Sequence, residues 1–407
     1  MKEDKTVPQL RFPEFTDAWK QRKVGDLLVE RREMVTEDNE YPLMAFIANE
    51  GVAPKGDRFD RSALVKNADS KKYKITKYGD FIYSSNNLES GSIGLNKYGK
   101  ASISPVYSIF YPTNLADSDF IGRYFLRKDF IGQMIRWRQG VVYGQWKIPE
   151  ADFLNIDIYI PSKDEQEKIG QILDKVDNTI TLQQRKLNSL QKLKKGLLQR
   201  MFPKNGENIP EIRFPEFSDA WKQRKFEDWG TFYYGKSCPK WSIDENAKTP
   251  CVRYGELYTK FGNKIDKVFS YTNIEPENLR FSTGKEVLIP RVGEDPFDYN
   301  HCTWLSIKGI AIGEMISVFN TDQDPQFSAT MFNATLKNEF AKRVEGGSVT
   351  NLYFEKLKNI LIYYPSLEEQ KKIASFFERI DQTITLQQRK LESLQKLKKG
   401  LLQQMFI

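Results

Sequence analysis

The sequence predicts an α+β fold in which two mixed α/β domains are joined by two long antiparallel coiled-coil helices, with an internal pseudo-two-fold repeat. The first observation behind this prediction is that residues 11–24 return at 213–226, with 12 of 14 positions identical. The second is that residues 179–202 return at 383–406 with only two changes. A chain of 407 residues that repeats itself in this way contains two versions of one frame.

The stretches between the repeats, residues 25–155 and 227–359, have similar lengths but largely different sequences. One frame therefore carries two different inserts, which is typical of a protein that performs one task twice on two different targets. The length leaves room for each insert to bury its own core. The predicted division is an insert domain at 1–155, a helix and linker at 156–209, a second insert domain at 210–359 and a final helix at 360–407.

Composition indicates a soluble globular protein, with 40% hydrophobic and 29% charged residues. No apolar run approaches the ~20 residues that span a bilayer, and the polar start of the chain lacks the apolar core of a signal peptide. We therefore expect a cytoplasmic protein without membrane contact. Cys238, Cys251 and Cys302 are odd in number and never spaced as C-x-x-C, which predicts neither a disulfide framework nor a metal site.

The net charge of +8 suggests an anionic partner, but its distribution narrows the inference. Residues 179–202 carry +6 and residues 383–406 carry +4, so the remainder of the chain is near −2. Composition therefore predicts no basic surface on the inserts. The basic helical segments are explained equally well by a solvated face and by contact with phosphates or an acidic partner.

Each repeated C-terminal segment is predicted to form a long helix. Ser162 and Ser366 each begin an S-x-x-E capping box that ends at Glu165 and Glu369, a pattern typical of a helix start. Beyond these caps, two sets of residues recur every seven positions and form a coiled-coil seam. The first seam comprises Ile169, Leu173, Val176, Ile180, Gln183, Leu187, Leu190, Lys194, Leu197 and Met201. The second comprises Ile373, Phe377, Ile380, Ile384, Gln387, Leu391, Leu394, Lys398, Leu401 and Met405.

Two such seams in one chain most simply pack on each other, and their polar positions predict a register. In an antiparallel pair that places Gln183 opposite Lys398, the same register places Lys194 opposite Gln387. We expect these amide and ammonium groups to hydrogen-bond, because either one facing leucine would be buried unpaired at a cost of roughly 1–3 kcal/mol. Such a pair would be ~45 Å long at ~1.5 Å per residue, and its length would set the distance between the two inserts.

The inserts are predicted to contain short strands and a few helices. Residues 80–83, 286–289 and 309–319 are rich in β-formers and bounded by turn residues. Helical stretches are expected at about 117–138 and 325–344. This pattern indicates mixed α/β domains.

Polar loops that follow the predicted strands carry side chains suited to the edges of bases. Arginine can form two hydrogen bonds to guanine, and asparagine or glutamine can form two to adenine. The alternative for any one of them is an ordinary loop residue. The candidates are Ser84, Ser85, Asn86, Asn87, Arg136, Arg138, Tyr143, Gln145 and Lys147 in the first half, and Arg291, Arg343, Ser348, Thr350 and Asn351 in the second.

These features resemble one known family over nearly the whole chain. The segment from 140 to 177, ending IDIYIPSKDEQEKIGQILDKVD, and its second copy from 346 to 381 resemble the specificity (S) subunit of type I restriction-modification systems. The turn at 77–80 also resembles the family's strand opening, but Lys285 stands where the second half should have Asp. The residues that match the family's junction between recognition domain and helix are Pro161, Gln166, Ile169, Pro365, Gln370 and Ile373.

The resemblance implies a DNA-binding subunit without chemistry of its own. Two target-recognition domains would read the two halves of a gapped target on double-stranded DNA, and the frame would hold two adenine-methyltransferase (M) subunits. In the full complex, motor-nuclease (R) subunits would join them. No cofactor is expected on this chain, because S-adenosylmethionine, ATP and Mg²⁺ belong to those partners.

Two other classes of protein are alternatives to a DNA-binding subunit: an enzyme and a purely structural protein. An enzyme is disfavoured because the phosphate-loop-like segment at 94–100 is followed by Ala101 where Ser or Thr would hold magnesium, and because His301 is the only histidine. A purely structural coiled-coil protein would explain the helices but leaves two large, dissimilar inserts without a purpose.

Overall fold

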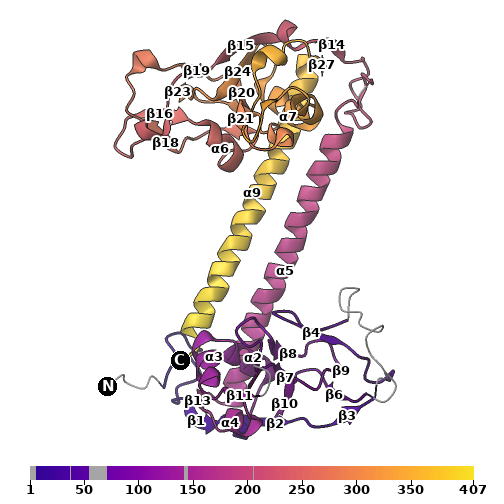
Figure 1. The fold of residues 1–407 in the computed structure, drawn as a ribbon, viewed down its shortest axis with the longest axis vertical. Helices are drawn as coiled ribbons and strands as arrows, with labels where there is room; N and C mark the ends of the chain where they lie inside the picture. The colour runs from indigo at the N-terminus through magenta and orange to yellow at the C-terminus, as the bar shows by residue number, and fades with distance from the viewer. Residues whose placement is uncertain (1–5, 37, 55–70, 142–144, 205) are drawn as a thin grey trace. The chain divides into compact units, whose positions relative to one another are not determined.

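Figure 1 shows the computed structural model of the chain, which describes residues 6–36, 38–54, 71–141, 145–204 and 206–407. The chain forms two compact units, each of which contains one insert and part of both long helices. The predicted division at residues 155, 209 and 359 follows the chain, whereas the compact units divide each long helix near its middle. The first unit is Met1–Gln184 with Lys390–Ile407, and the second is Arg185–Arg389.

The first unit is a mixed α/β domain around an antiparallel sheet with the strand order β2-β10-β7-β8. A smaller sheet, β3-β6-β9, and two hairpins, β4-β5 and β11-β12, complete the insert, while β1 pairs with β13 beside the start of the long helix. The elements are β1 (Lys20–Lys23), α1 (Val24–Leu27), β2 (Leu28–Glu30), β3 (Met34–Val35), β4 (Ala45–Ile47), β5 (Gly51–Ala53), β6 (Tyr73–Thr76), β7 (Phe81–Tyr83), β8 (Ile93–Leu95), β9 (Ala101–Ile103), β10 (Ser108–Pro112), α2 (Ser118–Phe125), α3 (Lys128–Arg136), β11 (Gln139–Val141), β12 (Gln145–Lys147), α4 (Glu150–Leu154) and β13 (Asp157–Ile160).

The core of this unit is aromatic, and it explains why the predicted helix over 117–138 is two helices. Arg127 has extended backbone angles and separates α2 from α3. This break lets Phe125 and Phe130 stack with their ring centres 4.2 Å apart, and Phe125 also packs edge-on against Phe81 of the central strand. Tertiary packing therefore overrides the continuous helical pattern of the sequence.

The main sheet of the second unit repeats the four-strand order of the first and adds a fifth strand, despite the different sequence. This sheet has the order β15-β24-β20-β22-β17, β14 pairs with β27, and a second sheet has the order β18-β16-β23-β19. The predicted strand over 309–319 is two strands, β23 and β24, and the predicted helix over 325–344 is again two helices. The elements are β14 (Lys222–Lys225), β15 (Gly230–Tyr234), β16 (Thr249–Val252), α6 (Tyr254–Thr259), β17 (Lys264–Ile265), β18 (Ser270–Thr272), β19 (Phe281–Thr283), β20 (Glu286–Pro290), β21 (Val292–Gly293), β22 (Thr303–Leu305), β23 (Lys308–Ile312), β24 (Ile316–Thr321), α7 (Pro325–Thr335), α8 (Lys337–Ala341), β25 (Glu345–Gly346), β26 (Thr350–Asn351) and β27 (Leu361–Tyr364).

The long helices are α5 (Lys163–Arg200) and α9 (Leu367–Gln404), and they begin as the capping motif predicts, with one difference. Ser162 Oγ accepts a hydrogen bond from the Glu165 backbone N–H, as in a capping box. The Glu165 carboxylate, however, does not return the bond to the cap. It receives two hydrogen bonds from the Arg11 guanidinium, at 2.8 and 2.7 Å.

The next residue of each helix joins it to the insert domain. The buried Gln166 amide accepts a hydrogen bond from Asp117 N–H and donates to the carbonyl groups of Leu115 and Pro161. Because Asp117 is also the N-cap of α2, this one amide fixes two helix starts together. Gln370 occupies the same position in the second unit, where it accepts from Asp324 N–H at the start of α7.

The end of each long helix is also built into a domain core. In the first unit Phe406 stacks on Phe120, and Leu10 N–H donates to the Gln404 carbonyl. In the second unit Phe202 packs against Trp221 and Phe327. The two repeated tails therefore serve the same packing role.

Within each unit the two long helices run antiparallel, side by side, as Figure 1 shows. Every predicted seam residue is buried or half-buried. An ion pair between Lys398 and Asp177, 2.7 Å long, joins the helices in the first unit, and one between Lys194 and Asp381, 2.5 Å long, joins them in the second. Burial alone would raise the pKa of Asp177, but hydrogen bonds from Lys398 and Arg123 outweigh it and lower that pKa.

The predicted amide–ammonium pairs are wrong. Lys398 and Lys194 pair with aspartates, and the Oε1 atoms of Gln183 and Gln387 are buried without a hydrogen-bond partner. The reason is that a carboxylate within reach of a flexible ammonium group forms a stronger hydrogen bond than an amide does. The two glutamines therefore lower the stability of the helix pair and do not form a hydrogen bond across the seam.

Replacing Gln183 with leucine should stabilise the helix pair by roughly 1 kcal/mol, because it removes a buried acceptor without a partner and fills the seam with apolar atoms. Urea unfolding followed by far-ultraviolet circular dichroism would measure the change. Gln191→Leu, at an exposed position of α5, is the control and should leave the midpoint unchanged. A loss of stability in Gln183→Leu would contradict the assignment.

Candidate nucleic-acid interface

Two segments about 60 residues apart that the sequence proposes as base readers come together in the first unit. The loop after β7 lies against strand β12 of the β11-β12 hairpin. Asn86 Oδ1 accepts a hydrogen bond of 2.6 Å from Trp146 N–H, and Ser85 Oγ accepts one of 3.0 Å from Ile148 N–H. The loop and the hairpin thus form one continuous surface on a rigid sheet.

Not every candidate in this half reaches solvent. Ser84 and Ser85 are buried, so their hydroxyl groups shape the loop, and any effect on base contacts would be indirect. Arg138 is half-buried and pairs with Glu89 at 2.9 Å, which ties the end of α3 to the loop after β7. Tyr143 lies outside the described residues. The exposed candidates are Asn86, Asn87, Arg136, Gln145 and Lys147.

Sequence reasoning missed two aromatic side chains on this surface. Trp137 is 44% exposed at the end of α3, and Trp146 is 48% exposed on β12. Each lies next to basic or amide side chains, in the sequences RWR and QWK. That alternation of basic and aromatic residues is the signal that could have identified them, since indole rings stack on bases and sugars.

In the second unit the loop after β20 meets the corresponding hairpin, β25-β26. Strand β21 pairs with β26, so Gly293 lies opposite Thr350, and Leu352 N–H donates to the Arg291 carbonyl. The buried Thr350 hydroxyl donates to the Gly293 carbonyl at 3.0 Å and is engaged by the Tyr299 hydroxyl. Thr350 therefore holds the hairpin in place and does not present its side chain at the surface.

The two arginines of this half are occupied inside the domain. The Arg291 guanidinium lies over the Tyr234 ring, 5.0 Å from its centre, and is half-buried. Arg343 pairs with Glu339 one helical turn earlier. Hydrogen bonds from Lys342 and Arg343 together lower the pKa of Glu339 despite partial burial. Ser348, at the exposed tip of the hairpin, and the half-buried Asn351 are the candidates with side chains nearest to solvent.

The arrangement can bind but offers no constellation for a reaction. Among the residues with described positions, no group of three His, Cys, Asp or Glu side chains is placed to hold a metal ion. His301 contacts Asp298 at 3.0 Å in an exposed turn. Across the same described ranges, no helix combines the length and apolar character needed to cross a membrane. Exposed amides, cations and indole rings on paired loops and hairpins are instead suited to polar recognition of an extended partner.

Comparison with known proteins gives one consistent result. The family model of the type I restriction modification DNA specificity domain matches residues 16–192 and 305–396, more than half of the chain. A Methanocaldococcus jannaschii protein assigned as the type I restriction enzyme MjaX specificity subunit is 23% identical over 417 residues, which cover 96% of this chain and 93% of that protein. The MjaVIII specificity subunit of the same organism is 26% identical over 281 residues, 63% of each chain.

A solved structure shares the fold. The type I restriction-modification system S subunit from M. genitalium matches with a TM-score of 0.60 over 98% of this chain and 99% of that one, at 14% identity. Two domains whose main sheets share a four-strand order, each with its own polar loop and hairpin and each built onto paired long helices, define a duplicated recognition subunit. The chain belongs to the type I restriction-modification DNA specificity domain family. Specificity subunits recognise DNA and are not catalytic, so this chain is not an enzyme.

Asn86→Ala should loosen the first hairpin, because it removes the acceptor that holds Trp146 N–H. The amide of Trp146 should exchange with solvent about fivefold faster, as expected for losing roughly 1 kcal/mol of local stability. Hydrogen exchange detected by mass spectrometry on peptides covering 145–150 would measure this. The control is Asn87→Ala, at the next position of the loop. Unchanged exchange in Asn86→Ala would show that the bond does not order the hairpin.

Proposed function

We propose that this chain is the specificity subunit of a type I restriction-modification complex that recognises a bipartite, gapped target on double-stranded DNA and holds two adenine-methyltransferase subunits. The observation that carries the proposal is the contrast between repeated and unrepeated surfaces. The repeated segments at 11–24 and 179–202 are nearly identical to those at 213–226 and 383–406, whereas the loop and hairpin of each insert carry different side chains. The repeated segments can bind two identical partner subunits, and the different loops and hairpins can bind two different half-sites.

The proposed readers combine two kinds of contact. In the first unit, Gln145 can form paired hydrogen bonds to adenine and Asn86 Nδ2 can donate one hydrogen bond to a base, while Arg136 and Lys147 can neutralise phosphates. In the second unit, the exposed hairpin tip around Ser348 offers hydroxyl and backbone groups instead. Because each set stands on a sheet whose strands are fixed, each can hold a defined position against the edges of bases.

The proposed docking face for methyltransferase subunits is a pair of exposed leucines in each unit. In the first unit Leu182 of α5 is 62% exposed and Leu397 of α9 is 50% exposed. In the second unit their repeat equivalents, Leu386 and Leu193, are 62% and 53% exposed. Large apolar side chains left in water at equivalent positions of both halves are typical of a surface that a partner covers.

The heptad places both leucines of a unit on one side of its helix pair. Leu397 directly precedes a seam residue, and Leu182 directly precedes Gln183 of the other seam, so both lie on the same flank of their helices. In an antiparallel pair these flanks adjoin. Gly400 in the first unit and Gly196 in the second lie on this flank too, and a Cβ atom there would meet nothing within 4 Å. A partner backbone could therefore approach closely.

The proposed partner subunits would carry out the reactions, which are DNA methylation and DNA cleavage. The methyltransferase subunits would bind S-adenosylmethionine, and the motor-nuclease subunits of the full complex would use ATP and Mg²⁺. This chain would supply the choice of sequence and the spacing between the two methylated adenines.

Gln145→Ala should relax base choice in one half-site only, at one position, by roughly 1–3 kcal/mol of discrimination. Ser348→Ala should act on the other half-site only. Genome-wide mapping of methylated adenine in cells that express each variant would read both half-sites at once. Lys192→Ala, on an exposed helix position, serves as the control and should leave the motif unchanged. Relaxation of both half-sites by one variant would contradict separate readers.

Replacing both leucines of one unit with aspartate, as in Leu182→Asp with Leu397→Asp, should reduce the number of bound methyltransferase subunits from two to one. Charged groups in an apolar contact cost more than the contact contributes. Native mass spectrometry of the purified complex would count the subunits. Thr181→Asp with Gln395→Asp, on the other flank of the helices, should leave two bound. Two subunits on the leucine variant would rule out this face.

A further inference from the structure

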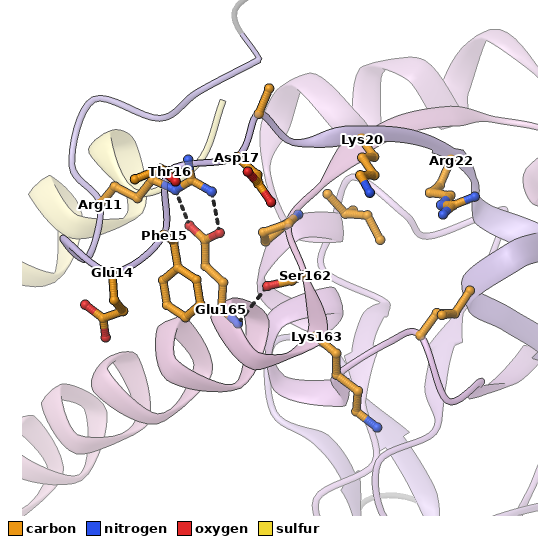
Figure 2. A pocket seen from close by; sticks show the side chains of 14 residues that line it. Arg11, Glu14, Phe15, Thr16, Asp17, Lys20, Arg22, Ser162, Lys163 and Glu165 are labelled. Carbon is orange, nitrogen blue, oxygen red and sulfur yellow. Dashed lines mark hydrogen bonds and ion pairs between the residues drawn. The ribbon is translucent and has the colours of Figure 1, made fainter.

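The same cavity occurs once in each unit, away from the readers and the leucine pairs. In the first unit a cavity of about 270 Å³ lies between the repeated segment at 11–18, strand β1 and the start of α5. Figure 2 shows the side chains that line it. The second unit has a cavity of about 410 Å³ between the repeated segment at 213–220, strand β14 and the start of α9.

The walls of both cavities are fixed by the same internal contacts. Arg11 binds the buried Glu165 with two hydrogen bonds, and Lys168 pairs with Glu14. In the second unit Arg213 binds Glu369 with two hydrogen bonds of 2.7 Å, and Lys372 pairs with Glu216. These contacts pair Glu165, Lys168 and their equivalents Glu369 and Lys372 with the repeated segment and hold that segment against the helix. The cavity is thus preformed.

Two cations of the repeated segment line each cavity, and Lys163 lines the first cavity as well, where the second has Leu367. Lys20 and Arg22 line the first, whereas Gln21 and Lys23 do not, because successive side chains of β1 point to opposite sides. Lys222 and Arg224 line the second in the same way, and the Arg224 guanidinium lies 4.9 Å from the centre of the Trp229 ring. Among the residues that the structure describes, no carboxylate forms an ion pair with Lys20, Arg22, Lys222 or Arg224.

The charged side chains that the repeated segment contributes to the cavities are the same in both halves. Lys20 and Arg22, and the carboxylates of Glu14 and Asp17, are exposed and all have identical counterparts 202 positions later. Packing restricts the identity of buried residues far more than that of exposed ones. Since the inserts of the same chain differ widely, exposed charges that are identical in both halves indicate that each half contacts the same kind of partner.

We infer that each cavity receives a carboxylate-bearing segment of one methyltransferase subunit, so that the two cavities hold two copies of it. This inference rests on the proposed function and adds a second contact to the leucine face. Lys20 and Arg22 would bind the partner's Asp or Glu side chains, and Asp17 would accept a hydrogen bond from the partner's backbone or a basic side chain. Both kinds of contact recur at Lys222, Arg224 and Asp219.

A DNA phosphate fits the cavities less well than a protein segment does. Glu14 and Asp17 line the first cavity beside the cations, and Glu216 and Asp219 line the second. Carboxylates at these places would repel a phosphate backbone, which presents negative charge only. A protein surface carries both signs and can satisfy cations and carboxylates together.

The test reverses the charge of the two repeated-segment cations in one cavity at a time. Lys20→Glu with Arg22→Glu should lower the number of bound methyltransferase subunits from two to one in native mass spectrometry, and adding Lys222→Glu with Arg224→Glu should lower it to none. The milder Lys20→Gln with Arg22→Gln keeps the strand polar and should weaken one of the two binding steps about tenfold. Gln21→Glu with Lys23→Glu, on the other side of the same strand, is the control and should leave both subunits bound.

The outcomes separate the cavity from the function as a whole. If the unmodified chain binds two methyltransferase subunits and the charge-reversal variants also bind two, the cavity inference is overturned while the proposed function stands. If the variants keep two subunits but bind non-specific duplex DNA more weakly, with a smaller salt dependence, the occupant is a phosphate backbone and the inference is likewise overturned. If the unmodified chain binds no methyltransferase subunit, the proposed function itself fails.

Discussion

The buried carboxylate at the start of each long helix is the interaction on which most of the architecture depends. Glu165 and Glu369 are almost inaccessible to water, so each needs the two hydrogen bonds of its arginine, and removing the arginine would leave an uncompensated charge at a cost of about 3–5 kcal/mol. The neighbouring Gln166 and Gln370 fix the same helix turn to the insert domain. One helical turn thereby joins the repeated segment, the helix and the reader domain.

This junction lets the inserts differ without disturbing the frame. The two main sheets share the order of four strands, and the second adds β17, although their sequences do not match. The frame specifies where each insert begins and ends. Strand β1 pairs with β13 just before α5, and β14 pairs with β27 just before α9. Within these limits, loops such as those after β7 and β20 are free to carry different side chains, as binding loops on rigid scaffolds generally are.

The sequence predicted what local patterns encode and missed what depends on contacts between distant residues. Helix starts and seams followed from spacing alone, and the two-unit organisation followed from the repeat. The break at Arg127 was not predictable, because it follows from the stacking of Phe125 on Phe130 and not from a helix-breaking residue. The burial of Thr350 and the pairing of Asn86 with Trp146 N–H likewise depend on segments 50 to 60 residues apart.

The polar residues of the helix pair affect both the register of the two helices and the stability of their seam. The unpaired Gln183 and Gln387 weaken the seam, yet both halves retain them while other positions of the same helices have diverged. The ion pairs of Asp177 with Lys398 and of Asp381 with Lys194 break together if one helix slides by a heptad. These ion pairs therefore penalise a shift of the register by one heptad. The helix pair therefore combines a defined register with less stability than an all-leucine seam would have.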